Sequence, residues 1–194
     1  LTLEDPIEYL HRHNASIINQ REIGSDTLSY AAGLRAAMRE SPDVILIGEM
    51  RDLETISIAL TAAETGHLVL STLHTVGAAK TIDRIVDIFP PNQQQQIKVQ
   101  LSTVLQAVVS QQLIPSERHG QVPAFEIMRA NGAIRNMIRE GKTPQIEGVM
   151  QMAGDQGMST MDLSLAALFK AGEISRSDAT HYAANPDSMQ RYLG

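Results

Sequence analysis

The sequence predicts an α/β fold with a mostly parallel sheet, and three observations within residues 44–75 support this prediction. A short apolar run, Val44 to Ile47, is bounded by turn-forming residues, as expected for a strand that is buried on both faces. Between Leu53 and Ala63 the apolar residues follow helical spacing. Residues 67–72 read as a second buried strand. A strand, a helix and a strand of these lengths form a right-handed βαβ unit.

The residues before this unit predict two more strands and a helix. Residues 1–4 read as a strand that Asp5-Pro6 ends, because proline disfavours a helical conformation at the residue before it. Residues 17–23 predict another strand. A helix is expected to begin at a cap within residues 25–27 and to run to about Glu40. Its inward face should carry Leu28, Ala31, Leu34 and Met38.

The residues after the unit predict two helices, a pair of strands and then a region of short helices. The helices cover residues 77–87 and the stretch from Pro91 onward, and strands are expected at 111–115 and 122–128. The long helix should bury one stripe made of Ile97, Leu101, Val104, Leu105 and Val108. Short helices are expected at 133–140, 144–153, 158–171 and 177–184. Ser159 with Asp162, and Ser175 with Asp178, have the spacing of a capping box at the start of two of these helices. We therefore expect an α/β core over residues 1–128 and a helical region over residues 129–194.

Composition excludes several classes of protein. The 194 residues carry a net charge of −6 and few aromatic side chains, which argues against broad nucleic-acid binding. The absence of cysteine excludes disulfides and thiolate metal sites. Because no apolar run is long enough for a membrane span and no signal peptide is found, we expect a cytoplasmic protein. The chain begins without methionine, on residues that already resemble a strand, so we expect a fragment of a larger fold.

Polar side chains follow both strands of the βαβ unit. Glu49 comes after the first strand, and Thr72 and His74 come after the second. In parallel sheets the carboxyl ends of the strands are where ligands bind, so these side chains predict a site. Glu49 could hold Mg²⁺ through water or polarise an attacking water, although Gly48 stands where most nucleotide hydrolases have Asp. His67 and His74 do not have the spacing of a zinc motif.

Two further stretches allow more than one interpretation. Glu4, Asp5 and Glu8 form either a solvated acidic turn or the source of a second catalytic carboxylate. Gly141-Lys142-Thr143 resembles the end of a phosphate-binding loop. A true loop would have glycine where this chain has Asn136, and it would follow a strand rather than a helix. We therefore do not expect this stretch to bind phosphate.

Taken together, the acidic and histidine motifs carry a family resemblance. Residues 4–8 resemble the acidic box, residues 46–52 the atypical Walker B motif and residues 65–75 the histidine box of the type II/IV secretion hexameric ATPases. Residues 133–140 are similar to the signature of the pilus retraction branch of that family, with Met137 in place of the usual leucine. Relatives that drive pilus assembly or type II secretion generally carry a four-cysteine metal module, so the absence of cysteine favours the retraction branch.

The resemblance implies a RecA-like P-loop NTPase core, truncated at its N-terminus. It also implies a homo-hexamer that uses ATP and Mg²⁺ to power pilus retraction and twitching motility. Such a motor lies at the cytoplasmic face of the bacterial inner membrane, pulls on an inner-membrane pilus platform protein and binds no nucleic acid. The alternatives that we keep are a pilus-assembly or type II secretion ATPase of the same family and a non-catalytic interaction module.

The same resemblance implies roles for individual residues. Glu49 would be the Walker B carboxylate that holds Mg²⁺ through water, Glu8 would activate the attacking water, and His74 would sense the γ-phosphate. Residues that support the nucleotide and Mg²⁺ would be Glu4, Asp5, Arg51, His67 and Thr72. Residues that couple the motor to its partner would be Arg135, Asn136 and Arg139. The phosphate-binding loop of the family has no counterpart in this sequence, so we expect the chain to be inactive alone.

Overall fold

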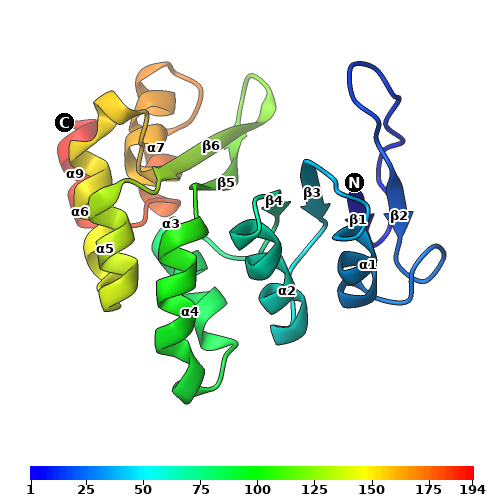
Figure 1. Cartoon of the computed structure of the whole chain (residues 1–194). Coiled ribbons are helices and arrows are strands. Elements are labelled where there is room, and N and C mark those ends of the chain that lie inside the picture. Colours follow the sequence, from blue (N-terminus) through cyan, green and yellow to red (C-terminus); the bar gives the residue numbers. More distant parts are fainter. The chain divides into compact units, whose positions relative to one another are not determined.

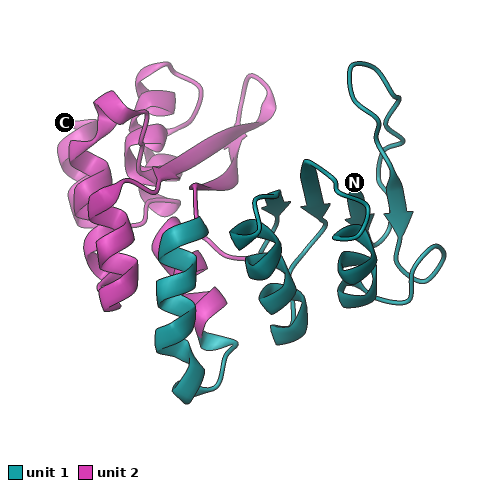
Figure 2. Cartoon of the chain, in the orientation of Figure 1, with its two compact units in different colours: residues 1–74, 87–104 teal, residues 75–86, 105–194 magenta.

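The computed structural model describes residues 1–194, which divide into two compact units (Figure 2). The first unit comprises residues 1–74 and 87–104, and the second comprises residues 75–86 and 105–194. We describe each unit by itself. The division into domains expected after residue 128 stays a prediction.

The first unit is an α/β layer built on four parallel strands (Figure 1). Its elements are β1 (Thr2–Glu4), β2 (Gln20–Glu22), α1 (Tyr30–Ala37), β3 (Val44–Ile47), α2 (Leu53–Glu64), β4 (Leu68–Ser71) and α4 (Pro91–Val104). The strand order is β2-β1-β3-β4, and every neighbouring pair is parallel. The predicted fold class and the predicted βαβ unit are therefore confirmed. The expectation that both strands of this unit are buried is corrected, because Val44, Leu68 and Leu70 are 40%, 50% and 47% exposed and β4 is an edge strand of the sheet.

Apolar side chains from the central strands and two helices form the core of this unit. The fully or nearly buried members are Leu3, Leu34, Ile45, Ile47, Ala59 and Ala62. Helix α2 packs against α1 and against α4. Because all four strands run the same way, their carboxyl ends meet at one edge of the sheet, where the chain continues after Glu4, Ile47 and Ser71.

Helix caps fix where α1 and α2 begin. The Asp52 carboxylate accepts hydrogen bonds from the backbone N–H of Thr55, at 2.8 Å, and from its hydroxyl, at 2.9 Å. Helix α1 begins later than predicted, because Ser29 caps it by accepting a hydrogen bond from the backbone N–H of Ala32 at 3.1 Å. Leu28, which was expected on the inward face, therefore precedes the helix and is 92% exposed.

Two other expectations about the first unit are corrected. The second strand is shorter than predicted and covers only Gln20–Glu22, since the chain before it forms a long loop from the end of β1 (Figure 1). Helix α4 ends at Val104, so the predicted stripe stops after Ile97 and Leu101, which are buried. Val108 instead belongs to a strand of the second unit.

The second unit combines a β-hairpin with short helices. Its elements are α3 (Ala78–Asp87, of which the last residue is grouped with the first unit), β5 (Ala107–Ser116), β6 (Gly120–Arg129), α5 (Gly132–Glu140), α6 (Ile146–Met152), α7 (Met161–Lys170), α8 (Arg176–His181) and α9 (Pro186–Leu193). Single 3₁₀ turns cover Thr143–Gln145 and Gly154–Gln156. Strands β5 and β6 pair antiparallel along their whole length.

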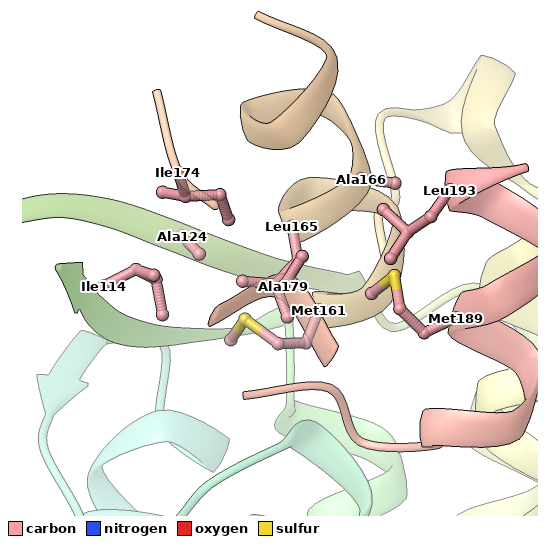
Figure 3. Close-up of a cluster of buried hydrophobic side chains, with 9 residues drawn as sticks. All are labelled: Ile114, Ala124, Met161, Leu165, Ala166, Ile174, Ala179, Met189 and Leu193. Carbon is pink, nitrogen blue, oxygen red and sulfur yellow. The ribbon is translucent and has the colours of Figure 1, made fainter. Parts of the chain in front are cut away.

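Helices α7, α8 and α9 close an apolar cluster over the hairpin (Figure 3). Its members are Ile114, Ala124, Met161, Leu165, Ala166, Ile174, Ala179, Met189 and Leu193. Helix α9 was not predicted, although it supplies Met189 and Leu193. The predicted cap at Ser175 is confirmed, whereas α7 is capped by Thr160 instead of Ser159.

Buried carboxylates hold this unit together. The Glu126 carboxylate accepts hydrogen bonds from the backbone N–H of Ala78, at 2.6 Å, and of Met161, at 3.3 Å, which are the first residues of α3 and α7. Asp162 accepts from the backbone N–H of Ala184 at 2.7 Å, ahead of α9.

No helix of the chain combines the length and the apolar character that a membrane span requires.

Candidate functional site

A cleft of about 310 Å³ opens in the first unit at the carboxyl ends of β1, β3 and β4. Its lining residues are Glu4, Asp5, Pro6, Glu8, Tyr30, Gly48, Glu49, Arg51, Thr72 and His74. Three segments that lie far apart in the sequence therefore meet at one place. Seven of the eight residues predicted for catalysis or for nucleotide and Mg²⁺ support line this cleft.

The acidic segment after β1 presents carboxylates of two kinds. The Glu4 carboxylate accepts hydrogen bonds from the Thr2 hydroxyl, at 2.5 Å, and from the Gln20 side-chain amide, at 3.0 Å. These bonds fix Glu4 against the sheet and occupy one of its oxygens. Asp5 and Glu8 are exposed, so their carboxylates are available to a ligand in the cleft.

Gly48 allows the close approach of three chain segments at the end of β3. A Cβ atom at this position would lie 3.0 Å from the Tyr30 hydroxyl, 3.3 Å from the Leu3 carbonyl oxygen and 3.5 Å from the Glu4 Cα. The first two distances are tighter than ordinary van der Waals contact, so a larger residue would force these neighbours apart. This crowding gives a physical reason for glycine, and not aspartate, before Glu49.

Glu49 is the buried carboxylate of the cleft. The residue is only 8% exposed, yet its two partners, Arg51 and His74, are surface side chains. Arg51 Nη2 lies 2.5 Å from Glu49 Oε1, and His74 Nε2 lies 3.3 Å from Glu49 Oε2. The His74 contact is within ion-pair distance but forms no hydrogen bond, and Glu49 Oε2 is left without a hydrogen-bond partner. An unsatisfied buried carboxylate oxygen is unusual and calls for a ligand.

The electrostatics of the cleft follow from this carboxylate. Its hydrogen bond and its negative charge raise the pKa of the Arg51 guanidinium, which stays charged. The Arg51 side chain is 71% exposed and that of His74 is 86% exposed, so both can move toward a ligand without breaking the core. The cleft therefore combines a buried carboxylate with two exposed side chains that can donate hydrogen bonds to a ligand.

Thr72 ties the ends of β3 and β4 together. Its hydroxyl donates a hydrogen bond to the Gly48 carbonyl at 2.5 Å, and its own carbonyl accepts one from the Met50 N–H at 3.2 Å. These two bonds hold the turn that carries Glu49 against the turn that carries His74. Thr72 thus acts by positioning the two turns.

His67 is the one predicted support residue that the structure does not bring to the cleft. It lies before the first residue of β4, at the opposite end of this strand from His74. Its ring Nδ1 is 3.0 Å from the Ala62 carbonyl oxygen and 3.3 Å from the Thr65 hydroxyl. These contacts stabilise the turn between α2 and β4.

The predicted coupling residues lie on α5, in the second unit. Ile134 and Ile138 are buried, as the helical spacing predicts. Arg135 donates a hydrogen bond to the Gln106 side chain at 3.4 Å, and Asn136 donates one to Glu140 at 3.0 Å. Arg139 lies on the exposed side of the same helix.

The stretch that resembles a phosphate loop is a helix end. Gly141 takes the left-handed conformation, with φ of 70°, and caps α5. Lys142 pairs with Glu140 at 2.6 Å, and the Thr143 hydroxyl donates to Asp83 at 2.7 Å. The stretch thus has neither the preceding strand nor the following long helix of a phosphate-binding loop.

Sequence reasoning missed Tyr30, which lines the cleft as the first residue of α1. No local signal indicates this place, because the neighbours of its hydroxyl belong to turns that are distant in sequence. Metal-binding capacity is limited, because no three His, Asp or Glu side chains are grouped so that they could hold an ion by themselves. A carboxylate such as Glu49 fits Mg²⁺ chemically, provided that water and a ligand supply the other oxygens.

Comparisons with known proteins show the family to which the chain belongs. The sequence pattern of the family described as "Type II/IV secretion system protein" matches residues 1–162. A twitching motility protein of Neisseria gonorrhoeae is 54% identical over 97% of this chain and 51% of its own length. The type IV pilus retraction ATPase PilT of Pseudomonas aeruginosa is 52% identical over 97% of this chain and 55% of its own length.

A solved structure is similar to the chain as well. The crystal structure of the pilus retraction motor PilT with bound ADP is 53% identical and has a TM-score of 0.91. The match covers 98% of this chain and 54% of that one. The chain thus spans about half the length of the relatives that it matches.

Proposed function

The chain belongs to the type II/IV secretion system protein family, and on this premise we propose that it forms part of an ATP-hydrolysing motor for type IV pilus retraction. The observation that carries the proposal is the meeting of three polar segments, at Glu8, Glu49 and His74, in one cleft. The similar proteins named for twitching motility and pilus retraction favour this role over pilus assembly or type II secretion.

The proposed substrate is ATP with Mg²⁺, which fits the ADP bound in the similar motor structure. When bound, Mg²⁺ would neutralise phosphate charge and would be held through water by Glu49. Exposed Glu8 would take a proton from the attacking water. The water oxygen would bond to the γ-phosphorus as the bond between that phosphorus and the bridging oxygen of ADP breaks. His74 would donate to a γ-phosphate oxygen, and Asp5 would support Mg²⁺ from the exposed acidic segment. Glu4 and Thr72 hold the surrounding turns.

Arg51 gives this site two states. In the structure it occupies one oxygen of Glu49, at 2.5 Å. A guanidinium pairs at least as well with phosphate oxygens as with a carboxylate. Because its side chain is 71% exposed, it can turn from Glu49 to the nucleotide when ATP enters. Glu49 is then released to hold the water ligands of Mg²⁺.

The same proposal includes the assembly of the motor and its partner protein. The family resemblance supports a homo-hexamer that lies at the cytoplasmic face of the inner membrane and acts on a pilus platform protein. Arg135, Asn136 and Arg139 would transmit the nucleotide state to that partner from α5. The net charge of −6 is consistent with a motor that binds no nucleic acid.

The test of the catalytic proposal is Glu49→Gln in the complete product of the gene that encodes these residues. We expect ATP hydrolysis to fall by at least about a hundredfold, since the charge is lost and the shape is kept. ATP binding should stay within a few-fold. The matched control is Glu117→Gln, because Glu117 is exposed at the tip of the β5–β6 hairpin and lies outside the cleft. Near-normal turnover of Glu49→Gln would refute the catalytic assignment.

The test of the coupling proposal is the double substitution Arg135→Ala, Arg139→Ala. We expect ATP hydrolysis to remain within a few-fold of the unmodified protein while twitching motility is lost. Asn136→Ala is the milder companion, since it removes a polar group without changing charge. Motility that survives the double substitution, or motility and hydrolysis that are lost together, would contradict a coupling role.

A further inference from the structure

Tyr30 brings a phenol hydroxyl into the acidic cleft. It is the first residue of α1, and it lines the cleft together with Asp5, Glu49 and Arg51. Tyr30 also lines a second cleft of about 300 Å³, at the start of α1 and α2. Tyr30 and Arg51 therefore form part of the wall between the two clefts.

The hydroxyl has a fixed place over the turn after β3. It lies 3.0 Å from the point that a Cβ atom of Gly48 would occupy. The missing side chain of Gly48 thus makes the room in which the hydroxyl sits, directly beside the residue that carries the buried carboxylate. The backbone of Leu3 and Glu4 closes the other sides of the same space.

The surroundings keep this hydroxyl protonated. Burial raises the pKa of Tyr30, and the negative charges of Glu49, Asp5 and Glu4 raise it further, whereas Arg51 lowers it. A phenol with a raised pKa is a neutral hydrogen-bond donor at every physiological pH.

The cleft needs such a donor if it is to hold phosphate. Four of its side chains, Glu4, Asp5, Glu8 and Glu49, are carboxylates that repel a nucleotide. The Thr72 hydroxyl gives its proton to the Gly48 carbonyl and cannot serve. Only Arg51, His74 and Tyr30 remain as side-chain donors among the lining residues.

We propose that Tyr30 is a further binding residue of this site, whose hydroxyl donates a hydrogen bond to an oxygen of the nucleotide γ-phosphate. The inference rests on the proposed ATPase function. Placement beside Glu49 selects the γ-phosphate, because that carboxylate and His74 act there in the proposed reaction. We expect this hydrogen bond to be best aligned in the transition state of hydrolysis. A bond of that kind assists hydrolysis more than it assists the binding of ATP.

The experiment compares Tyr30→Phe with the unmodified complete gene product. The substitution removes one oxygen and keeps the ring that packs in the wall. We expect kcat for ATP to fall about tenfold, the size expected for one hydrogen bond to a charged group. The Kd for ADP, which lacks the γ-phosphate, and the melting temperature should stay unchanged. Tyr9→Phe is the matched control, since Tyr9 is 79% exposed and does not line the cleft.

Each other outcome overturns the inference in a recognisable way. If Tyr30→Phe hydrolyses ATP at the unmodified rate, its hydroxyl does not act on the substrate. A weaker affinity for ADP or a lower melting temperature that accounts for the lost activity would assign Tyr30 to packing alone. The proposed function itself fails separately, either through absent hydrolysis in the unmodified protein or through full activity of Glu49→Gln.

Discussion

Glu49 in the first unit and Glu126 in the second are equally buried carboxylates with opposite surroundings. Each residue is 8% exposed. Glu126 accepts hydrogen bonds from two backbone N–H groups at the first residues of helices, where the helix dipole also favours an anion. Glu49 has only the exposed side chains of Arg51 and His74, and one of its oxygens has no hydrogen bond.

The contrast separates a structural carboxylate from one that is prepared for a ligand. Backbone donors cannot leave, so Glu126 is committed to joining α3, β6 and α7. Asp162 in the same unit follows this pattern, since it accepts from two backbone N–H groups and the Ser188 hydroxyl. Side-chain donors can rotate away, so Glu49 can exchange them for a metal-bound water or another ligand. Burial alone would not have distinguished the two residues.

The sharpest test of this contrast compares Glu126→Gln with Glu49→Gln in urea unfolding of the chain. Glu126→Gln should lower the free energy of unfolding by about 2 kcal/mol, because an amide NH₂ group is brought against a backbone donor. Glu49→Gln should change it by less than about 0.5 kcal/mol. The lost contacts are with two exposed side chains, Arg51 and His74, and a neutral group is then buried in place of a charged one. Equal losses in both variants would remove the distinction.

A second test probes the crowding around Gly48. Gly48→Ala places a methyl group against the Tyr30 hydroxyl and the Leu3 carbonyl oxygen. We expect the free energy of unfolding to fall by about 1 kcal/mol, as is typical of mild overpacking. Thermal unfolding measures this directly, with Gly132→Ala as the control, because no heavy atom lies within 4 Å of the added Cβ there. A melting temperature that is unchanged in both variants would show that the space at Gly48 is not limiting.

The smallest effect that we expect on the free energy of unfolding is that of a substitution at Glu147 in α6. Burial and the negative charges of Asp162 and Glu126 raise its pKa above the ordinary 4.5, while a hydrogen bond from Gln151 lowers it. A raised pKa means that the folded state binds this proton more tightly, so stability is present below pH 4.5 and is lost as pH rises through the raised pKa.

Glu147→Gln should remove this loss. Because the residue is exposed, water screens the repulsion, and the expected gain at pH 7 is only about 0.3 kcal/mol. At pH 4 the variant and the unmodified chain should be equally stable. Urea unfolding at both pH values measures the difference. A variant that is less stable at pH 7 would show that the Glu147 charge is favourable.

The parts of the fold that depend on local pattern could be predicted from the sequence. The apolar run of β3, the helical spacing of α2 and the cap at Ser175 each express a preference that neighbouring residues determine. The first helix was placed too early, because residues 25–27 have the same cap chemistry as Ser29. Only tertiary packing, which leaves Leu28 in solvent, decides between these candidates.

The residues of the candidate site also differ in whether the sequence could predict them. Glu49, Thr72 and His74 were predictable because the carboxyl ends of neighbouring parallel strands must meet. His67 and His74 are indistinguishable by residue type, and the strand direction alone places them at opposite ends of β4. Tyr30 and Glu126 were not predictable, because their partners are backbone atoms or turns distant in sequence.

The shared space of Gly48 and Tyr30 makes their substitutions interdependent. A side chain at position 48 should lower the free energy of unfolding while the Tyr30 hydroxyl is present. This loss should be smaller once the hydroxyl is removed, because the Leu3 carbonyl oxygen is then the nearest remaining neighbour. The order of changes therefore matters, both along an evolutionary lineage and in a design campaign. The less crowded route to a larger residue before Glu49 therefore begins with a change at position 30 that removes the hydroxyl. Scans of single substitutions would discard that route, whereas a library that varies both positions together would find it.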